Sequence, residues 1–346
     1  MDNAYATTDK PTSGTETQLV TLDDIRAAAD RIQDLVLRTP IIALPHPDRP
    51  SDILHLKAES LQPTGAFKLR GAYNTISQVL DESRERGIIA QSSGNHARAV
   101  AWLAKRLDLH AVIVMPDAAP PTKVAAVRAL GAEVVLVPAS ERDSRTVELA
   151  AEHGYVEVPP YDDVRIIAGQ GTVGLELIEQ LPDLDVVLVP ISGGGLISGI
   201  ATAIKSLRPE VQVIGVEPEL AADAAESLRE QRRITWDTKL TYRTVADGLR
   251  TPAVGVHPWE HIRRYVDDVV TVSEEQILAA VRHIAVEGRL VAEPSGAVAT
   301  AAWMHDLAPR GATVAAVVSG GSVDPALMAR VLANWSPFGM PPRRQR

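Results

Sequence analysis

The stretch Val186–Gly199 reads VVLVPISGGGLISG, an apolar run followed by three consecutive glycines and a second apolar segment. A continuous β-branched run without alternation is typical of a strand that is buried on both faces of a parallel sheet. Glycines at positions 193–195 allow backbone N–H groups to converge where a helix begins near Leu196, and such a helix start favours an anion. The stretch therefore predicts a strand, a phosphate-binding loop and a helix.

Similar apolar runs and amphipathic stretches alternate along the chain and predict the fold class. The other short apolar runs are Ala111–Met115, Glu133–Val137, Val211–Val216 and Thr313–Val318. The stretches with helical spacing between them include Val124–Leu130, Thr172–Gln180 and Glu275–Glu287. Buried strands that alternate with amphipathic helices predict an α/β fold with a mostly parallel sheet.

Composition excludes several classes of protein and of site. The chain has 346 residues with a net charge of −9, which argues against a nucleic-acid-binding protein. It contains no cysteine, so disulfides, thiolate nucleophiles and cysteine-ligated metal sites are excluded. No apolar run approaches the length of roughly 18–20 residues that spans a membrane. Residues 1–18 are polar and do not resemble a signal peptide, so we expect a flexible tail and a cytoplasmic protein.

The glycine loop by itself leaves the ligand open. Gly193, Gly195 and Gly199 are spaced much like a dinucleotide-binding fingerprint. Glu217 ends the next apolar run about 20 residues later, where a ribose-binding carboxylate is expected. These two features alone make a nicotinamide-dependent oxidoreductase a competing hypothesis. A non-catalytic phosphate-binding protein is a second one.

A lysine segment points to a different chemistry. Residues 59–72 read ESLQPTGAFKLRGA, in which Pro63 and Gly65 indicate a turn before Lys68. We expect Lys68 to lie beside Phe67 at the start of a helix. The positive helix end and partial burial there would both lower the pKa of its amine from about 10.4. Schiff-base chemistry requires such a lowered pKa.

Together, several motifs resemble one enzyme family. Lys57–Ala72 is similar to the cofactor-lysine segment of the fold-type II pyridoxal-phosphate enzymes, in the threonine dehydratase and serine racemase branch. The further blocks that match, in the family's order, are Ser92–Ala97 (SSGNHA), Ala168–Thr172 (AGQGT), Ser192–Leu196 (SGGGL), Val245–Gly248 (VADG), Ala292–Ala297 (AEPSGA) and Val318–Gly321 (VSGG). The resemblance extends from about Leu22 to Leu332, nearly the whole chain.

The resemblance implies a fold and a domain division. The fold would be tryptophan synthase β-like, with two open parallel-sheet α/β domains and the active site in the cleft between them. Residues 19–86 and 164–346 would form the large cofactor-binding domain, and residues 87–163 the small one. Closure of the small domain would exclude water from the cleft. The family also implies a homodimer.

Roles toward pyridoxal 5′-phosphate follow from the same resemblance. Lys68 would hold the cofactor as a Schiff base and move the α-proton on one face. Asn95 would contact the ring hydroxyl, and Ser319 the pyridine nitrogen. A hydroxyl at that nitrogen makes the ring a weaker electron sink, which suits β-elimination. The other positions assigned to the cofactor are Phe67, Ser192, Gly193, Gly194, Gly195, Leu196 and Glu293.

The implied reaction is that of an ammonia-lyase, or dehydratase, which converts L-threonine or L-serine to a 2-oxo acid and ammonia. The substrate carboxylate would be bound around Ser92, Ser93, Gly94, Asn95 and His96. Ser93 matches the serine racemase and hydroxyaspartate dehydratase pattern, in which a hydroxyl faces the lysine from the opposite side of the substrate. Two opposed proton-transfer groups permit racemisation. A serine racemase and a threo-3-hydroxyaspartate dehydratase therefore remain alternatives.

A second site is implied near the end of the run Val211–Val216. Glu217, Ala221 and Asp223 resemble the divalent-cation loop of these enzymes, in which two carboxylates and a carbonyl are ligands. Oxygen ligands completed by water suit Mg²⁺ or Ca²⁺.

Three positions depart from the family pattern: Ser192 replaces a glycine, Ala66 replaces a serine, and Arg98 replaces a glutamine. We expect the Ser192 hydroxyl to donate to phosphate, and Arg98 either to favour an acidic substrate or to face solvent.

Overall fold

The structure is a computed structural model that describes residues 19–333, and the predicted tail at residues 1–18 lies outside them. Its strands form two separate sheets. The strands are β1 (Ile41–Pro45), β2 (Ile53–Lys57), β3 (Ile88–Gln91), β4 (Ala111–Pro116), β5 (Glu133–Val137), β6 (Val156–Glu157), β7 (Val186–Pro190), β8 (Gln212–Pro218), β9 (Asp268–Val272) and β10 (Val314–Val317).

The helices connect and cover these strands. They are α1 (Leu22–Ile32), α2 (Lys68–Gln78), α3 (Leu80–Arg86), α4 (Asn95–Leu107), α5 (Pro121–Ala129), α6 (Arg142–His153), α7 (Val164–Gln180), α8 (Gly195–Leu207), α9 (Asp223–Glu230), α10 (Thr238–Thr241), α11 (Val256–Tyr265), α12 (Glu274–Val286), α13 (Pro294–Met304) and α14 (Pro325–Ala333). The short 3₁₀ turns are η1 (Glu59–Leu61), η2 (Ala139–Glu141) and η3 (Asp247–Leu249).

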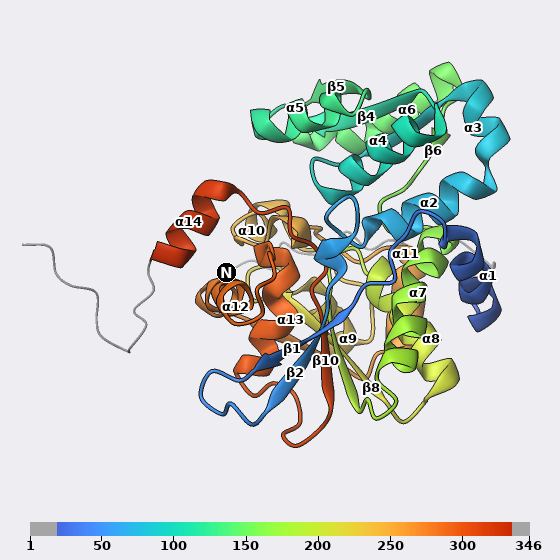
Figure 1. Ribbon diagram of the computed structural model, residues 1–346. Helices are drawn as coiled ribbons and strands as arrows, with labels where there is room; N and C mark the ends of the chain where they lie inside the picture. Colours follow the sequence, from blue (N-terminus) through green and yellow to red (C-terminus); the bar gives the residue numbers. More distant parts are fainter. Residues whose placement is uncertain (1–18, 334–346) are drawn as a thin grey trace, which may run out of the picture.

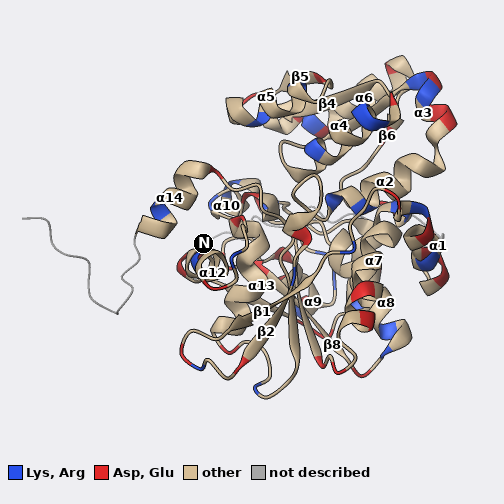
Figure 2. Cartoon of the chain, viewed as in Figure 1, with Lys and Arg blue, Asp and Glu red and all other residues tan. Residues whose placement is uncertain are grey.

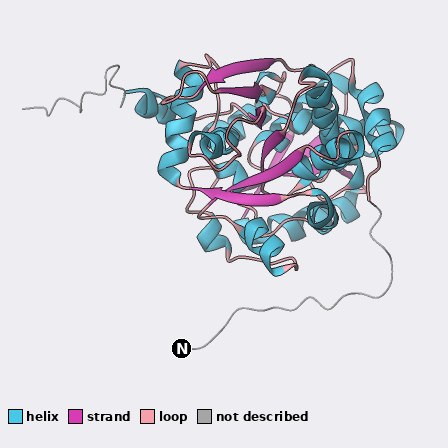
Figure 3. Ribbon diagram, turned by 90° about the horizontal axis from the view of Figure 1, so that it is seen from below, coloured by secondary structure: helices cyan, strands magenta, loops and turns pink. Residues whose placement is uncertain are grey.

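The large sheet has the strand order β1-β2-β10-β7-β8-β9, and only the pair β1–β2 is antiparallel. Its central strands are buried on both faces, as predicted. Val186 and Leu188 of β7 pack in one hydrophobic core, whereas Val187 and Val189 pack in the core on the opposite face. Figure 3 shows helices on both sides of the strands.

The small sheet has the order β5-β4-β3-β6, and all of its pairs are parallel. The strand Glu133–Val137 was predicted correctly, but its expected burial on both faces is wrong. It is an edge strand, so Glu133 is exposed and Leu136 is 44% exposed. The central strand β4 is buried along its whole length.

Helix α2 joins the two halves of the molecule. It contacts α7 of the large half and α4 of the small half, and Figure 1 shows it between the two sheets. Leu69, Ala72 and Ile76 of α2 belong to the same hydrophobic core as Ile88 and Ile113 of the small sheet. The residue that begins α2 therefore lies between the two sheets.

The surface carries charges of both signs. Figure 2 shows Lys and Arg interspersed with Asp and Glu along α1 and α3. Within residues 19–333, no helix combines the length and the apolar composition that crossing a bilayer requires.

Candidate functional site

Lys68 is the first residue of α2, as the sequence predicted. The turn before it contains Gly65 with a φ of +80°, a left-handed conformation that favours glycine. The Nζ atom of Lys68 donates a hydrogen bond of 2.5 Å to the carbonyl of Pro160 and lies 5.1 Å from the centre of the Phe67 ring. Loss of contact with water lowers the pKa of the Lys68 amine to about 8. Roughly a tenth of the amine is therefore uncharged at pH 7, and about half at pH 8.

A buried charge network holds the first turn of α2. Arg70 donates to both carboxylate oxygens of Glu59, at 2.7 and 2.8 Å, and to Oε1 of Glu176 in α7 at 2.7 Å. Burial opposes ionisation of Glu59, but Arg70 outweighs it and holds the pKa of that carboxyl below its usual value. Lys57 also pairs with Glu176. Sequence reasoning missed this network, whose members lie up to 119 residues apart.

The loop that follows β10 lies against the lysine segment. The Phe67 N–H donates to the Ser319 carbonyl at 3.0 Å, and the Gly321 N–H donates to the Gly65 carbonyl at 2.9 Å. Ser319 is buried, and its hydroxyl lies 3.5 Å from the carbonyl of Ser295. The motif predicted to meet the pyridine nitrogen therefore lies beside the predicted cofactor lysine.

Asn95 and Glu293 face each other across the two halves of the molecule. Asn95, the first residue of α4, donates from Nδ2 to Oε1 of Glu293 at 2.5 Å. A Cβ atom at Gly320 would lie 2.2 Å from that Glu293 oxygen and 2.9 Å from Asn95 Nδ2, so the pair requires a glycine there. Burial and the nearby charge of Asp247 raise the pKa of Glu293 to about 7.

The loop Ser92–Gly94 precedes α4, and the backbone N–H groups in the first turn of α4 indicate an anion site. The first-turn N–H groups of a helix have no partner within that helix, which leaves those of Asn95 and His96 available to a carboxylate. The Ser92 hydroxyl accepts from the Gly94 N–H at 3.1 Å. The Ser93 hydroxyl makes no hydrogen bond with any residue of the described chain.

His96 is buried in the first turn of α4 and remains neutral. Its Nε2 lies 2.8 Å from the Val158 carbonyl, whereas its Nδ1 is buried and has no partner among residues 19–333. Burial, together with the charge of Lys68, lowers the pKa of His96 to about 3. Nε2 must therefore carry the proton that it donates to Val158, and Nδ1 is a free acceptor.

The glycine loop joins β7 to α8, as predicted. Gly194 has a φ of +87° and caps α8, which begins at Gly195, and Leu196 is buried in its first turn. The Ser192 hydroxyl lies within hydrogen-bonding distance of the Thr251 hydroxyl. The hydroxyl that we expected to donate to phosphate therefore already ties the loop to Thr251, and the phosphate-binding role of the loop stays a prediction.

Comparison with known proteins identifies the family. The profile of the family described as pyridoxal-phosphate dependent enzyme matches residues 32–320. The chain belongs to this family.

Three relatives define the branch of these pyridoxal-phosphate enzymes to which the chain is similar. An L-threonine ammonia-lyase of Thermotoga maritima is 42% identical over 320 residues, which cover 91% of this chain and 78% of that protein. An L-threo-3-hydroxyaspartate ammonia-lyase of Saccharomyces cerevisiae is 40% identical over 308 residues, covering 88% and 94%. The structure of maize serine racemase has a TM-score of 0.84 and 36% identity, and the match covers 92% of this chain and 98% of that chain. The family and fold class predicted from the motifs are confirmed.

The nicotinamide hypothesis is not supported by the position of Glu217. This residue lies in β8, is 0% exposed, and accepts hydrogen bonds from the N–H groups of Ala224 and Ala225 at 3.1 and 2.8 Å. A carboxylate buried in this way cannot reach the ribose of a dinucleotide.

The predicted cation ligands lie near one another at the end of β8. Burial and the nearby Asp223 raise the pKa of Glu217, and burial raises the pKa of Asp223 to about 8. Oδ2 of Asp223 is buried without a partner among the described residues. Across residues 19–333, no three His, Asp or Glu side chains converge as a metal-binding group, so Glu217 and Asp223 would supply only two side-chain ligands.

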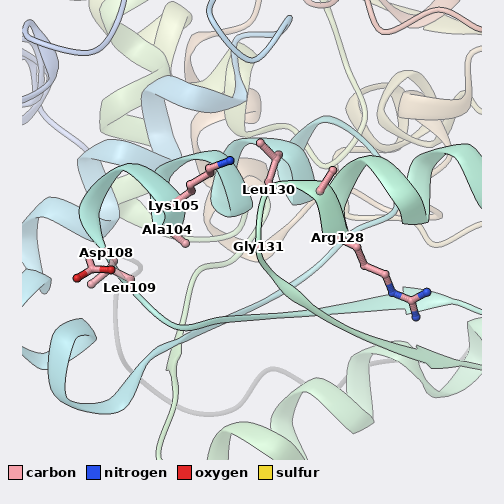
Figure 4. Close-up of a pocket in the computed structure, with 8 residues that line it drawn as sticks. Ala104, Lys105, Asp108, Leu109, Arg128, Leu130 and Gly131 are labelled. Carbon is pink, nitrogen blue, oxygen red and sulfur yellow. The ribbon is translucent and has the colours of Figure 1, made fainter.

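A surface hollow of about 320 Å³ lies elsewhere, at the C-terminal ends of α4 and α5. Figure 4 shows Lys105, Asp108 and Arg128 around it. It contains none of the predicted site residues, so we assign the site to the Lys68 region instead.

Sequence reasoning also missed the segment Val158–Asp163. Its Val158 and Pro160 carbonyls contact His96 and Lys68, and the ring of Tyr161 lies against Gly193. These partners are distant in the sequence, and only the proline pair gave a local signal.

Proposed function

We propose that this protein is a pyridoxal-phosphate-dependent ammonia-lyase that removes water from L-threonine or L-serine and gives a 2-oxo acid and ammonia. One observation carries the proposal most directly. The amine of Lys68 lies against Pro160, and the adjacent Tyr161 lies on Gly193 of the glycine loop. A reactive amine and an anion-binding loop are thus linked by two consecutive residues. Pyridoxal phosphate needs both, because its aldehyde bonds to an amine and its phosphate binds to an anion site.

The described residues fit this cofactor. The glycine loop places the start of α8 at an anion site, because Gly194 adopts the left-handed conformation that the turn requires. His96 keeps a buried acceptor without a partner, and the missing side chain at Gly320 lets the Asn95–Glu293 pair lie against the loop that carries Ser319. Pyridoxal phosphate, when bound, supplies an aldehyde that bonds to amines and a ring that withdraws electrons from the substrate's α-carbon.

The protein's own groups would then bind, orient and move protons. Lys68, with its lowered pKa, would bond to the cofactor and accept the α-proton once its amine is released. Asn95 Nδ2, held by Glu293, would donate to the ring hydroxyl. The Ser319 hydroxyl would meet the ring nitrogen from its buried position. The first-turn amides of α4 would hold the substrate carboxylate.

A substrate panel tests the proposal. Purified protein supplied with pyridoxal phosphate is mixed with L-threonine, L-serine or 3-hydroxyaspartate, and 2-oxo acid and ammonia are measured. We expect release of both products from at least one substrate, and no release by a Lys68→Ala variant. Equal product from the variant, or none from the wild type with any of the three, would refute the proposal.

Racemisation and 3-hydroxyaspartate elimination are second candidates. The observation that favours them is the Ser93 hydroxyl, which makes no hydrogen bond with a described residue and is therefore free to exchange a proton with substrate. Chiral chromatography of L-serine after incubation detects D-serine. A Ser93→Ala variant should lose D-serine formation while it keeps elimination, and D-serine formed equally by both proteins would exclude this role of Ser93.

We also propose a bound Mg²⁺ or Ca²⁺ at Glu217, Asp223 and the Ala221 carbonyl. A cation would offset the cost of two buried carboxylates and occupy the unpartnered oxygen of Asp223. We expect Mg²⁺ to raise the melting temperature of the wild type but not that of an Asp223→Asn variant. An equal rise in both proteins would exclude the site.

The domain division at residues 87–163, a homodimer and a cytoplasmic location complete the proposal. The exposed apolar side chains of Leu61 and Val291, 44% and 54% exposed, offer a surface for a second copy. Light scattering measures the mass in solution, and a monomer mass would exclude the dimer. Cell fractionation tests the location.

A further inference from the structure

The segment between β6 and α7 contacts three parts of the site in three consecutive residues. The Pro160 carbonyl accepts the hydrogen bond of the Lys68 amine at 2.5 Å. Tyr161 lies against Gly193 of the glycine loop. The carboxylate of Asp162 accepts from the N–H groups of Val256 and His257, at 2.8 and 2.9 Å, where α11 begins. We call residues 160–162 the strap.

The contact between Tyr161 and Gly193 is close enough to exclude any side chain at position 193. A Cβ atom added to Gly193 would lie 2.2 Å from Cγ, 2.3 Å from Cδ1 and 2.5 Å from Cδ2 of the Tyr161 ring. These distances place the ring directly over the glycine. A Cβ atom at Gly195 would lie 3.0 Å from the Tyr161 carbonyl, so the strap covers the loop at two positions.

The other side of Gly193 is also fixed. Its carbonyl accepts a hydrogen bond of 3.0 Å from the N–H of Gly255. A Cβ atom at Gly255 would in turn lie 2.6 Å from Cγ of Asp162. Gly193 is therefore held between the Tyr161 ring and a backbone that the strap itself anchors through Asp162.

We propose that Tyr161 is a positioning residue that, through Gly193, fixes the phosphate loop at the distance from Lys68 that a rigid two-ended cofactor requires. The inference rests on the proposed function, because it takes the loop as the phosphate site. A ligand that binds both the Lys68 amine and the phosphate loop gains affinity when the protein already holds these two groups at the required distance. A ligand that reaches only Lys68 gains nothing from the loop.

The ring, rather than the hydroxyl, performs this role. The Tyr161 hydroxyl makes no hydrogen bond with any described residue. Burial, with the nearby charges of Asp143 and Asp162, raises its pKa to about 12, so it stays protonated under working conditions. Phenylalanine should therefore replace tyrosine, whereas alanine should not.

Pyridoxal and pyridoxal phosphate distinguish the contribution of Lys68 from that of the phosphate loop. Both carry the aldehyde that reacts with Lys68, but only the second carries a phosphate. Affinities of the cofactor-free protein are measured from the visible absorption band of the lysine adduct, without substrate. We expect Tyr161→Ala to weaken pyridoxal phosphate binding about tenfold or more and to change pyridoxal binding less than about twofold, and Tyr161→Phe to restore the wild-type ratio.

Steric complementation gives a second, independent readout. Gly193→Ala should weaken pyridoxal phosphate binding at least as much as Tyr161→Ala, because its Cβ collides with the ring. In the double variant the ring is gone, so the added methyl group should cost less than about twofold beyond Tyr161→Ala alone. A structural role of Tyr161 elsewhere does not predict this rescue.

Tyr155 offers a matched control. It also packs over a glycine, with Cδ1 3.3 Å from a Cβ added at Gly87, but it lies directly before β6 of the small sheet and does not contact Gly193. Tyr155→Ala should leave the ratio of the two affinities unchanged. An equal loss of affinity for both ligands in Tyr161→Ala, or no rescue in the double variant, would overturn the inference. A wild type that binds neither ligand would overturn the proposed function as well.

Discussion

Replacing Glu293 by glutamine should make the cofactor-free protein less sensitive to alkaline pH. The carboxyl group is 5% exposed and accepts a hydrogen bond from Asn95, which the glutamine carbonyl oxygen can also accept. Burial and the charge of Asp247 raise the Glu293 pKa to about 7, from a usual value of 4.5. The folded state therefore binds this proton more tightly than the unfolded state does. The contribution of the protonated Glu293 carboxyl to stability is fully present below pH 4.5 and is lost as the pH rises through about 7.

The size of the effect follows from the two pKa values. Each unit of pKa corresponds to about 1.4 kcal/mol, so ionising the buried carboxyl costs the folded state on the order of 3 kcal/mol above neutrality. Glutamine cannot ionise and avoids this cost. The difference in unfolding free energy between Glu293→Gln and wild type should therefore rise by about 2.5 kcal/mol from pH 5 to pH 8.5, because part of the cost is already present at pH 5.

Urea unfolding of the cofactor-free proteins at the two pH values measures this difference. Other titrating groups are common to both proteins and cancel. Glu287→Gln, at the exposed residue that follows α12, is the control and should show less than about 0.5 kcal/mol of change. A Glu293→Gln effect that is the same at pH 5 and pH 8.5 would refute the reasoning.

Three further predictions follow from other residues. The Lys68 amine should react with limiting acetic anhydride at a rate that is half-maximal near pH 8 and level by about pH 9.5, which peptide mapping measures; a half-maximal rate near pH 10 would contradict its lowered pKa. Arg70→Ala should lower the unfolding free energy by about 3–5 kcal/mol because Glu59 is left buried without its partner, and a loss below 1 kcal/mol would show that the network is dispensable. Gly199→Ala should cost about 1–3 kcal/mol in thermal unfolding, because its Cβ would lie 2.3 Å from the Ile167 carbonyl oxygen, and an unchanged melting temperature would contradict this close packing.

Local sequence pattern was sufficient for the fold class and for the central strands. The β7 run and the glycines after it were predicted because burial, turn and helix start follow one another within 14 residues. The start of α2 at Lys68 was also predicted from the turn before it. The strands β1, β2, β3, β6 and β9 were not predicted; β6 has only two residues, and His55 interrupts the apolar run of β2.

The contacts that assemble the site were less accessible to sequence reasoning. Arg70 and Glu176 are 106 residues apart, and Lys68 and Pro160 are 92 apart. Nothing in a local window indicates which distant carbonyl will receive a lysine amine. Burial of Glu133–Val137 was predicted wrongly for a related reason, because an edge strand has the same residue pattern as a central one until its neighbours are known.

The central claim is that Lys68 holds pyridoxal phosphate. The most direct measurement is borohydride reduction of the protein loaded with pyridoxal phosphate, followed by mass spectrometry of its peptides. We expect one cofactor mass per chain, on the peptide that contains Lys68, and none in a Lys68→Ala variant. A cofactor mass on another lysine, or no adduct on the wild type, would contradict it.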